Sequence, residues 1–385
     1  MLELFRNRKF RETFFQALAV SVVAVVLIAM VVNARNALEV QGLTAGFGFL
    51  ERSTGWDFSF SVLPYSISDT YQRTLWIGLL NTLLLGFLGI SLATVFGVIV
   101  GLVRTSNNYL LSLLGTVYVE IFRNIPIILQ GIFWYAVLSN LPRPRQAMVL
   151  GDSIFLSGRG LYFPVLNVEL SAVFVMLAIV IAWFITLAWL RNRMRRSLTF
   201  ERIKLSGWIA LPLLLIAIGY IARIPETALV DTPILKGLNF RGGMRIPPEL
   251  SALVLAIALY GGAYIGEVMR AGLQSVPRGQ IEAGFVNGLS KFQIFWYVRL
   301  PLAIRLILPS LTNQYVQLMK ATTIGIAVGF SDFFMIVSTS INQGGQTLEL
   351  LLILVLGFLA INLSIAYVMN TINRRIALKG YEVKD

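Results

Sequence analysis

Long apolar runs recur along the whole chain, and they constrain its fold more than any other feature. Several of these runs exceed the roughly 18 apolar residues with which a helix crosses a bilayer. The 385 residues are 57% hydrophobic and only 13% charged, whereas a soluble domain carries about 25% charged residues. Backbone groups in lipid must be satisfied internally, and the short alternating segments of a membrane barrel are not apparent. We therefore predict an all-α polytopic membrane protein.

We place about eight transmembrane helices along the chain. The first follows a basic flank, as a signal peptide does, but its apolar run is longer than a signal-peptide core and no small-x-small cleavage site follows it. We therefore expect an uncleaved first helix. The predicted spans lie near residues 14–32, 75–103, 110–138, 170–190, 208–221, 250–272, 304–330 and 348–369.

Basic residues predict the orientation of these spans. The net charge of +13, from 32 Lys and Arg against 19 Asp and Glu, would suggest nucleic acid as a partner of a soluble protein. Here the basic residues cluster at span ends, and an inside N-terminus puts most of them on the cytoplasmic side. We therefore predict two cytoplasmic termini and no nucleic-acid partner. Short ordered helices are expected in the long outside segments, 33–73, 140–169 and 223–249.

Two residue types that carry much enzyme chemistry are missing. The chain has neither cysteine nor histidine, so it lacks thiolates, the commonest general base and the commonest metal ligand. A GxxxxGK[ST] phosphate-binding loop is also absent from the sequence. We therefore expect no catalytic residues, no metal site and no cofactor within this chain.

A polar, glycine-punctuated segment at residues 280–301 lies between two apolar spans. A proline shortly before it favours a helix start, and we predict one short helix over residues 280–287. Gly288 can end that helix in a left-handed conformation. Ser290 can then begin a second short helix over residues 291–298. Two short helices joined at a glycine form a compact knob, which can transmit a push from a partner protein.

This segment resembles the EAA loop of ABC-importer permeases. The family pattern is Glu-Ala-Ala, three residues, Gly, about nine residues, Ile, one residue and Leu-Pro. The matching positions here are Glu282, Ala283, Gly284, Gly288, Val298, Leu300 and Pro301, with Gly284 and Val298 departing from the family's Ala and Ile. The resemblance implies that residues 275–302, hereafter the coupling loop, dock into an ATP-hydrolysing subunit. It assigns this coupling to Gly279, Gln280, Glu282, Ala283, Gly284, Gly288 and Leu289.

Further motifs resemble the polar-amino-acid subfamily of these permeases and, within it, the general L-amino-acid branch of the AapQ/BztB type. They include Tyr264–Gly272, Tyr118–Pro126, Leu318–Thr323 and Gly78–Thr82. The resemblance implies a type I permease core of five helices, with an extra N-terminal helix and an extra helix pair. We expect the parts to be residues 1–73 (first helix and outside loop), 74–139 (first part of the core), 140–249 (insertion with the helix pair) and 250–385 (rest of the core).

Polar side chains within the predicted spans are candidates for a substrate pathway, because such groups are costly in lipid. An amino acid is a zwitterion, so its two charges require opposite charges or hydrogen-bonding groups. The candidate pathway residues are Tyr264, Glu267, Asn313, Gln317, Lys320, Thr322 and Thr323. Gating or structural roles are expected for Glu120, Arg123, Asn124 and Pro126. The alternative is purely structural, with pairs such as Glu120–Arg123 and Glu267–Arg270 within one helix.

The resemblance implies a permease subunit of an ATP-driven importer of L-amino acids in a bacterial inner membrane. Its expected partners are an ABC ATPase dimer that binds ATP and magnesium, a periplasmic amino-acid-binding protein and a second permease. A heterodimer is expected, and a homodimer remains open. An ion-coupled secondary transporter is the first alternative, but the inverted repeats and broken helices of such proteins are not apparent. A membrane scaffold or receptor subunit without a pathway is the second.

Overall fold

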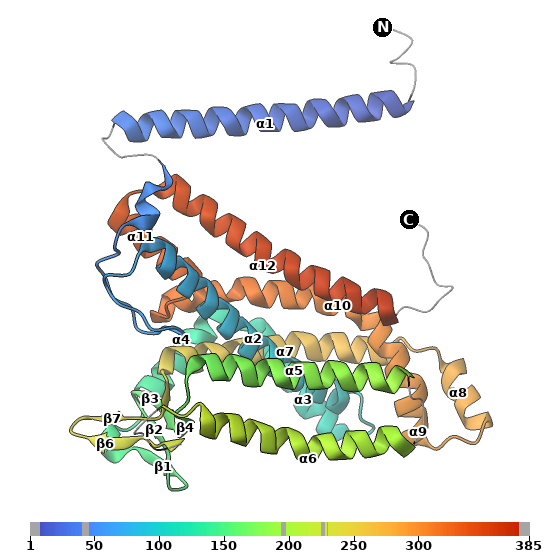
Figure 1. Cartoon of the computed structure of the whole chain (residues 1–385). Helices are drawn as coiled ribbons and strands as arrows, with labels where there is room; N and C mark the ends of the chain where they lie inside the picture. The colour runs from blue at the N-terminus through green and yellow to red at the C-terminus, as the bar shows by residue number, and fades with distance from the viewer. Residues whose placement is uncertain (1–7, 41–45, 194–197, 225–227, 229, 377–385) are drawn as a thin grey trace. The chain divides into compact units, whose positions relative to one another are not determined.

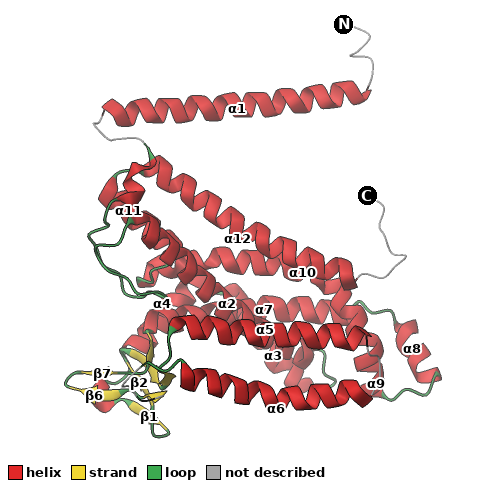
Figure 2. Ribbon diagram, viewed as in Figure 1, coloured by secondary structure: helices red, strands yellow, loops and turns green. Residues whose placement is uncertain are grey.

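The computed structural model describes residues 8–40, 46–193, 198–224, 228 and 230–376 (Figure 1). The chain divides into two compact units. The first unit comprises Met1–Ile132 and Leu253–Asp385, and the second comprises Phe133–Ala252. The described strands all belong to the second unit (Figure 2). Helices predominate in the described chain, which confirms the predicted class.

Helices make up nearly all of the regular structure in the first unit. They are α1 (Arg8–Val40), η2 (Phe47–Glu51), α2 (Tyr71–Arg104), α3 (Tyr109–Asn124), α8 (Arg278–Val286), α9 (Lys291–Ile294), η4 (Phe295–Arg299), α10 (Leu300–Ala321), η5 (Thr322–Val328), α11 (Phe333–Gly344) and α12 (Thr347–Ile376). Two further helices, α4 (Ile127–Ser139) and α7 (Pro248–Gln274), run across the boundary between the units.

Five helical segments of the described chain are long and apolar enough to cross a membrane, and the bent pair α3–α4 adds a sixth if the pair counts as one span. The five are Tyr71–Arg104, Ile203–Ile221, Pro248–Gln274, Lys291–Val328 and Thr347–Ile376. Shorter apolar stretches lie at Phe14–Met30 and Ser171–Leu187. Multiple membrane-spanning helices are therefore confirmed, whereas the count of eight stays a prediction.

A face of small residues on α2 lets its backbone approach α7 closely. Gly89, Ala93, Gly97 and Gly101 recur at every fourth position, which places them on one side of the helix. A Cβ atom at Gly97 would lie 2.4 Å from Cγ2 of Ile265, and the same addition at Gly101 would lie 2.4 Å from Cβ of Met269. The close contact between α2 and α7 therefore requires glycine, which has no Cβ, at these positions.

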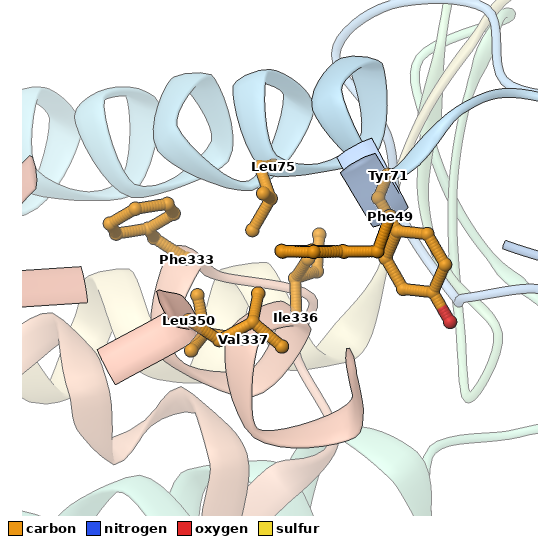
Figure 3. Packing of buried hydrophobic residues seen from close by; sticks show 7 residues of the cluster. All are labelled: Phe49, Tyr71, Leu75, Phe333, Ile336, Val337 and Leu350. Atoms are coloured by element: carbon orange, nitrogen blue, oxygen red, sulfur yellow. The ribbon is translucent and has the colours of Figure 1, made fainter. Parts of the chain in front are cut away.

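Buried apolar side chains join η2, α2, α11 and α12 in one cluster (Figure 3). Phe333 lies between two glycines: a Cβ at Gly78 would be 3.1 Å from its Cα, and a Cβ at Gly357 would be 2.4 Å from its ring. Along α2 and α12, many bulky apolar side chains remain exposed in the isolated chain. The cluster members are Phe49, Tyr71, Leu75, Phe333, Ile336, Val337 and Leu350.

The predicted span over residues 110–138 is not one straight helix, because α3 and α4 meet at a bend of 101°. Ile125 is extended, with φ −91° and ψ 124°, since the following Pro126 disfavours the helical conformation of the residue before it. Gln130 stabilises the bend from the first turn of α4. Its Nε2 donates to the carbonyls of Phe122 and Ile125, each at 3.0 Å, which would otherwise lack partners at the end of α3.

The second unit combines short antiparallel strands with a helix pair. The four-stranded sheet has the order β1 (Met148–Leu150), β2 (Ile154–Ser157), β3 (Gly160–Phe163) and β8 (Met244–Ile246). Two-stranded ribbons pair β4 (Val165–Leu166) with β5 (Val230–Asp231), and β6 (Ile234–Lys236) with β7 (Asn239–Arg241). The helices α5 (Leu170–Arg193) and α6 (Leu198–Ile221) lie between β4 and β5 in sequence.

The expectation of short helices in residues 140–169 and 223–249 is therefore wrong, apart from the single turn η3 (Pro144–Gln146). Glycines explain much of the difference. Gly151 and Gly237 have φ values of 69° and 68°, and such left-handed positions in short turns let a chain return as a hairpin. The alternating burial of β3 shows the period-two pattern of a half-buried strand.

Candidate functional site

The first helix of the coupling loop ends in a glycine cap. Gly288 has φ 76°, as the sequence predicts, and the N–H of Leu289 donates to the carbonyl of Gly284 at 3.1 Å. The N–H of Gly288 donates to the carbonyl of Phe285 at 2.9 Å. These two bonds form the Schellman arrangement, which fixes the direction in which the chain leaves α8.

A capping box begins the second helix. The N–H of Gln293 donates to Oγ of Ser290 at 3.3 Å, and the N–H of Ser290 donates to Oε1 of Gln293 at 2.9 Å. The predicted helix over residues 291–298 is only partly correct, because α9 ends at Ile294 and a π-helical turn leads directly into α10. Pro301 lies just after this turn and cannot donate a backbone hydrogen bond, so a local irregularity is expected there.

Gly284 is the one buried member of the predicted coupling residues. A Cβ at this position would lie 2.9 Å from Cγ1 of Ile294, so the departure from the family's alanine has a packing reason. Glu282 and Ala283, on the other side of α8, are exposed. The knob also exposes large apolar side chains, namely Phe285, Val286, Phe292, Trp296 and Tyr297. An exposed apolar patch beside charged groups is typical of a protein-binding surface.

Contacts with α7 and α10 hold the knob at its base. Nε of Arg299 donates to the carbonyl of Leu273 at 3.0 Å, which satisfies a carbonyl at the C-terminal end of α7. Leu273, Val276 and Ala303 form a small buried cluster beneath the loop. A force on the knob would therefore be transmitted to both helices.

Glu267, a predicted pathway residue, lies between two arginines. It forms ion pairs with Arg270, one turn further along α7, and with Arg104 at the end of α2. Nε of Arg270 also donates to Oε2 of Glu267 at 3.1 Å. Sequence reasoning named the pair within α7 but missed Arg104. The arrangement neutralises the carboxylate with protein charges, which is the geometry of a structural ion cluster.

The end of α3 brings a predicted gating residue to a predicted pathway residue. Cζ of Arg123 lies 4.9 Å from the ring centroid of Tyr264, and the ring of Tyr264 lies 4.8 Å from that of Tyr260. The pair of Glu120 with Arg123, which the structural alternative requires, is not among the ion pairs of the described chain. Glu120 instead accepts a hydrogen bond from Nδ2 of Asn124 at 3.2 Å, because an i, i+4 partner shares its helix face.

The remaining predicted pathway residues differ in accessibility. Asn313, Gln317 and Lys320 are exposed on α10, whereas Thr322 is fully buried. Oγ1 of Thr322 donates to the carbonyl of Met319 at 2.8 Å, and Oγ1 of Thr323 donates to that of Lys320 at 2.9 Å. The two hydroxyls therefore stabilise the junction of α10 and η5. The side chains of Asn313, Gln317 and Lys320 are accessible to a substrate or a partner.

Asn81 is a buried polar residue whose role sequence reasoning missed. Its side chain is 0% exposed, and its Nδ2 donates to the carbonyls of Phe60 at 3.0 Å and Ser331 at 2.7 Å. Its Oδ1 accepts from the N–H of Val62 at 3.1 Å. An amide within an apolar helix is itself a signal for such a role. Here it joins the loop before α2 to the segment between η5 and α11.

Asp332 lies in that same segment and is also fully buried. Its Oδ1 accepts a hydrogen bond from the N–H of Met335 at 2.8 Å and so caps the N-terminus of α11. Oδ2 of Asp332 has no hydrogen-bond partner in the described chain. Burial raises the pKa of the Asp332 carboxyl to about 7. Within the described residues, acidic side chains do not gather in a set that could hold a metal ion.

Comparison with known proteins places this geometry in a family. The family described as "Binding-protein-dependent transport system inner membrane component" matches residues 206–378. The coupling loop and its flanking helices α7 and α10 lie inside that match.

Three curated relatives align over nearly the entire chain. The putative amino-acid ABC transporter permease protein YhdX of Escherichia coli (strain K12) is 40% identical over 97% of this chain and 96% of its own length. The general L-amino acid transport system permease protein AapQ of Rhizobium johnstonii is 35% identical, over 96% of this chain and 93% of its own.

The third relative is the glutamate/glutamine/aspartate/asparagine transport system permease protein BztB of Rhodobacter capsulatus. It is 33% identical over 98% of this chain and 96% of its own length. These matches confirm the resemblance drawn from the sequence motifs. The chain belongs to the family of inner-membrane permease components of binding-protein-dependent ABC transport systems.

Proposed function

We propose that this permease is the translocating subunit of an ATP-driven importer of L-amino acids. The observation that carries the proposal is the coupling loop, a rigid two-helix knob with exposed apolar side chains that is tied to both α7 and α10. Relatives that align over nearly the whole chain are named as amino-acid permeases, which supports the substrate class.

The proposed mechanism converts ATP hydrolysis elsewhere into movement of these helices. Two ATPase subunits bind ATP and magnesium, and their closure pushes on the coupling loop. Because Arg299 links the loop to the end of α7, α7 and α10 move together with it. Such a movement shifts a permease pair between outward-open and inward-open states, which differ in which side the substrate can reach.

Within this proposal, the exposed α10 face with Asn313, Gln317 and Lys320 contributes to the pathway. Its ammonium and amide groups suit the carboxylate of an amino acid. The pair of Arg123 and Tyr264 lies where a change in the α3–α4 bend would move it, and we assign it to gating. Glu267 holds α2 and α7 together through its two arginines, so we propose a structural role for it.

The proposed assembly contains a second permease, an ATPase dimer and a soluble amino-acid-binding protein. Its location is a bacterial inner membrane, with both termini of this chain in the cytoplasm. Recovery of the tagged protein from mildly solubilised membranes tests the assembly. We expect an ATPase with a phosphate-binding loop and a second permease to accompany it, whereas recovery of the protein alone would contradict the proposal.

Charge reversal at Glu282 tests the role of the coupling loop. Glu282 is exposed and sits on the outer side of α8, so Glu282→Lys should leave folding intact while weakening contact with the ATPase. We expect the purified complex to lose most of its substrate-stimulated ATP hydrolysis. Glu201→Lys, a matched reversal at an exposed glutamate of α6, should retain the stimulation. Full stimulation in the Glu282→Lys complex would overturn the assignment.

A further inference from the structure

A cleft of about 880 Å³ lies in the second unit, beside the short strands. It is lined by Asn140, Arg143, Arg145, Gln146, Arg159 and Leu238, among others. Three arginines thus converge on one concavity, and none of the described residues that line it is acidic. The cleft is strongly basic, and neither the coupling loop nor the proposed pathway includes it.

Close backbone contacts and hydrogen bonds hold together the segments that line this cleft. Gly158, in the turn between β2 and β3, lies so close to the segment after α4 that a Cβ there would be 2.7 Å from the carbonyl oxygen of Ser139. The N–H of Gly158 also donates to the carbonyl of Pro142 at 2.9 Å. Nε of Arg145 donates to the carbonyl of Gly237, in the turn between β6 and β7, at 3.2 Å. Arg145 therefore connects two segments that line the cleft, the turn after α4 and the turn between β6 and β7.

The other two arginines, Arg143 and Arg159, have guanidinium groups that can bind a partner. In the part of the chain that the structure describes, no hydrogen bond or ion pair engages the guanidinium group of Arg143 or Arg159. Both side chains are exposed. A guanidinium group is well suited to bind carboxylates, because it can donate two parallel hydrogen bonds.

Exposed apolar side chains occur in the cleft and elsewhere in the same unit. Leu238, which lines the cleft, is 68% exposed, and all three residues of the edge strand β1 (Met148–Leu150) are more than half exposed. Arginine combined with exposed apolar side chains is typical of protein–protein interfaces. This composition favours a protein partner with surface carboxylates over a small anion, which would need a more enclosed site.

Chain topology indicates which side of the membrane this partner occupies. β8 ends at Ile246 and α7 begins at Pro248, while the coupling loop follows the other end of α7 after Gln274. A helix of 27 residues is about 40 Å long, which suffices to cross a bilayer. Because the coupling loop must face the ATPase, the strand next to α7 is expected on the opposite, outer face.

We propose that the cleft around Arg143 and Arg159 docks the acidic surface of the soluble binding protein that delivers substrate. This inference rests on the proposed function, since the family is binding-protein-dependent. The arginines accelerate and orient the encounter by long-range attraction, and exposed apolar side chains such as Leu238 then pack against the partner. The inserted strands would thereby provide a delivery platform outside the membrane.

The test uses the whole transporter, purified with its partner subunits and reconstituted in uncharged phosphatidylcholine vesicles. The probe is the soluble protein of the same host that stimulates wild-type ATP hydrolysis. For Arg143→Glu/Arg159→Glu we expect the half-maximal concentration of this protein to rise about tenfold or more, with basal hydrolysis and the rate at saturation unchanged. Arg52→Glu, a reversal at an exposed arginine of the first unit, should leave that concentration unchanged.

Salt dependence gives a second readout that does not depend on one variant. The half-maximal concentration for the wild type should rise with ionic strength, because screening weakens exposed charges, and should rise less for the double variant. An unchanged half-maximal concentration in the double variant would overturn the inference. A defect seen only in vesicles with anionic lipid would also overturn it and would assign the cleft to lipid headgroups. If no soluble protein stimulates the wild type, the proposed function itself fails.

Discussion

At the scale of single residues, Gly97 shows that the packing of α2 against α7 requires a residue without a Cβ. Its replacement by alanine would place a Cβ 2.4 Å from Ile265 and 3.1 Å from the backbone nitrogen of Gly266. Overpacking of this kind costs about 1–3 kcal/mol. We predict that Gly97→Ala lowers the melting temperature of the detergent-purified protein. Gly48→Ala, at a site with nothing within 4 Å, is the control, and equal melting temperatures would contradict this packing.

Asp332 makes a pH-dependent contribution to stability. Its pKa is about 7 in the folded protein and about 4 in an unfolded chain, so folding favours its neutral form. That stabilisation is fully present below pH 4 and is lost as the pH rises through 7. Asp332→Asn retains a side chain that caps helices and cannot ionise.

We therefore predict that Asp332→Asn is more stable than the wild type at pH 8, by up to about 4 kcal/mol. The difference should shrink as the pH falls through 7 towards 5. Melting curves of both proteins across this range measure it. Asp332→Ala removes the cap and should be less stable than Asp332→Asn at every pH. A constant difference between wild type and Asp332→Asn would show that Asp332 does not titrate there.

Several residue-level features of the site could be predicted from sequence, and the reason is local. Gly288 and Ser290 act through backbone atoms within a few positions, so their types and spacing suffice. Arg104 and Glu267 lie 163 positions apart, and their ion pair depends on how α2 crosses α7. Only the tertiary structure reveals that partner.

At the scale of elements, the bend between α3 and α4 depends on Gln130. Its side chain is 4% exposed and bonds two carbonyls at the end of α3. Leaving both partly buried acceptors without donors costs about 1–3 kcal/mol each at most. We predict that Gln130→Leu lowers the melting temperature clearly, whereas Gln72→Leu, at an exposed glutamine of α2, does not. Equal effects of the two changes would contradict the capping role.

Sequence reasoning missed the bend between α3 and α4 and the strands of the second unit. Apolar composition alone predicts neither of them. Residues 110–138 are apolar enough for one span, and the restriction that Pro126 places on Ile125 breaks the helix there. In the second unit, β3 pairs with β8 across more than 80 residues, and no local pattern indicates such pairing. Helices could be predicted because their hydrogen bonds are local.

At the scale of the whole molecule, apolar runs determine a multi-span helical protein, and the proposed coupling to ATP rests on the coupling loop. The knob, its apolar surface and its link to α7 are local or nearly local features. The basic cleft of the second unit is not, because it needs the turns of two hairpins and the end of α4 to meet. The proposed coupling site was thus accessible from sequence, whereas the proposed docking surface required the structure.

The most direct test of the central claim is uptake of radiolabelled L-amino acids into proteoliposomes that contain this permease with its partner subunits. The binding protein is supplied outside, ATP is supplied inside, and ion gradients are abolished. We predict uptake that requires internal ATP and the binding protein and that Glu282→Lys strongly reduces. Uptake driven by an ion gradient without ATP would contradict the account and identify a secondary transporter.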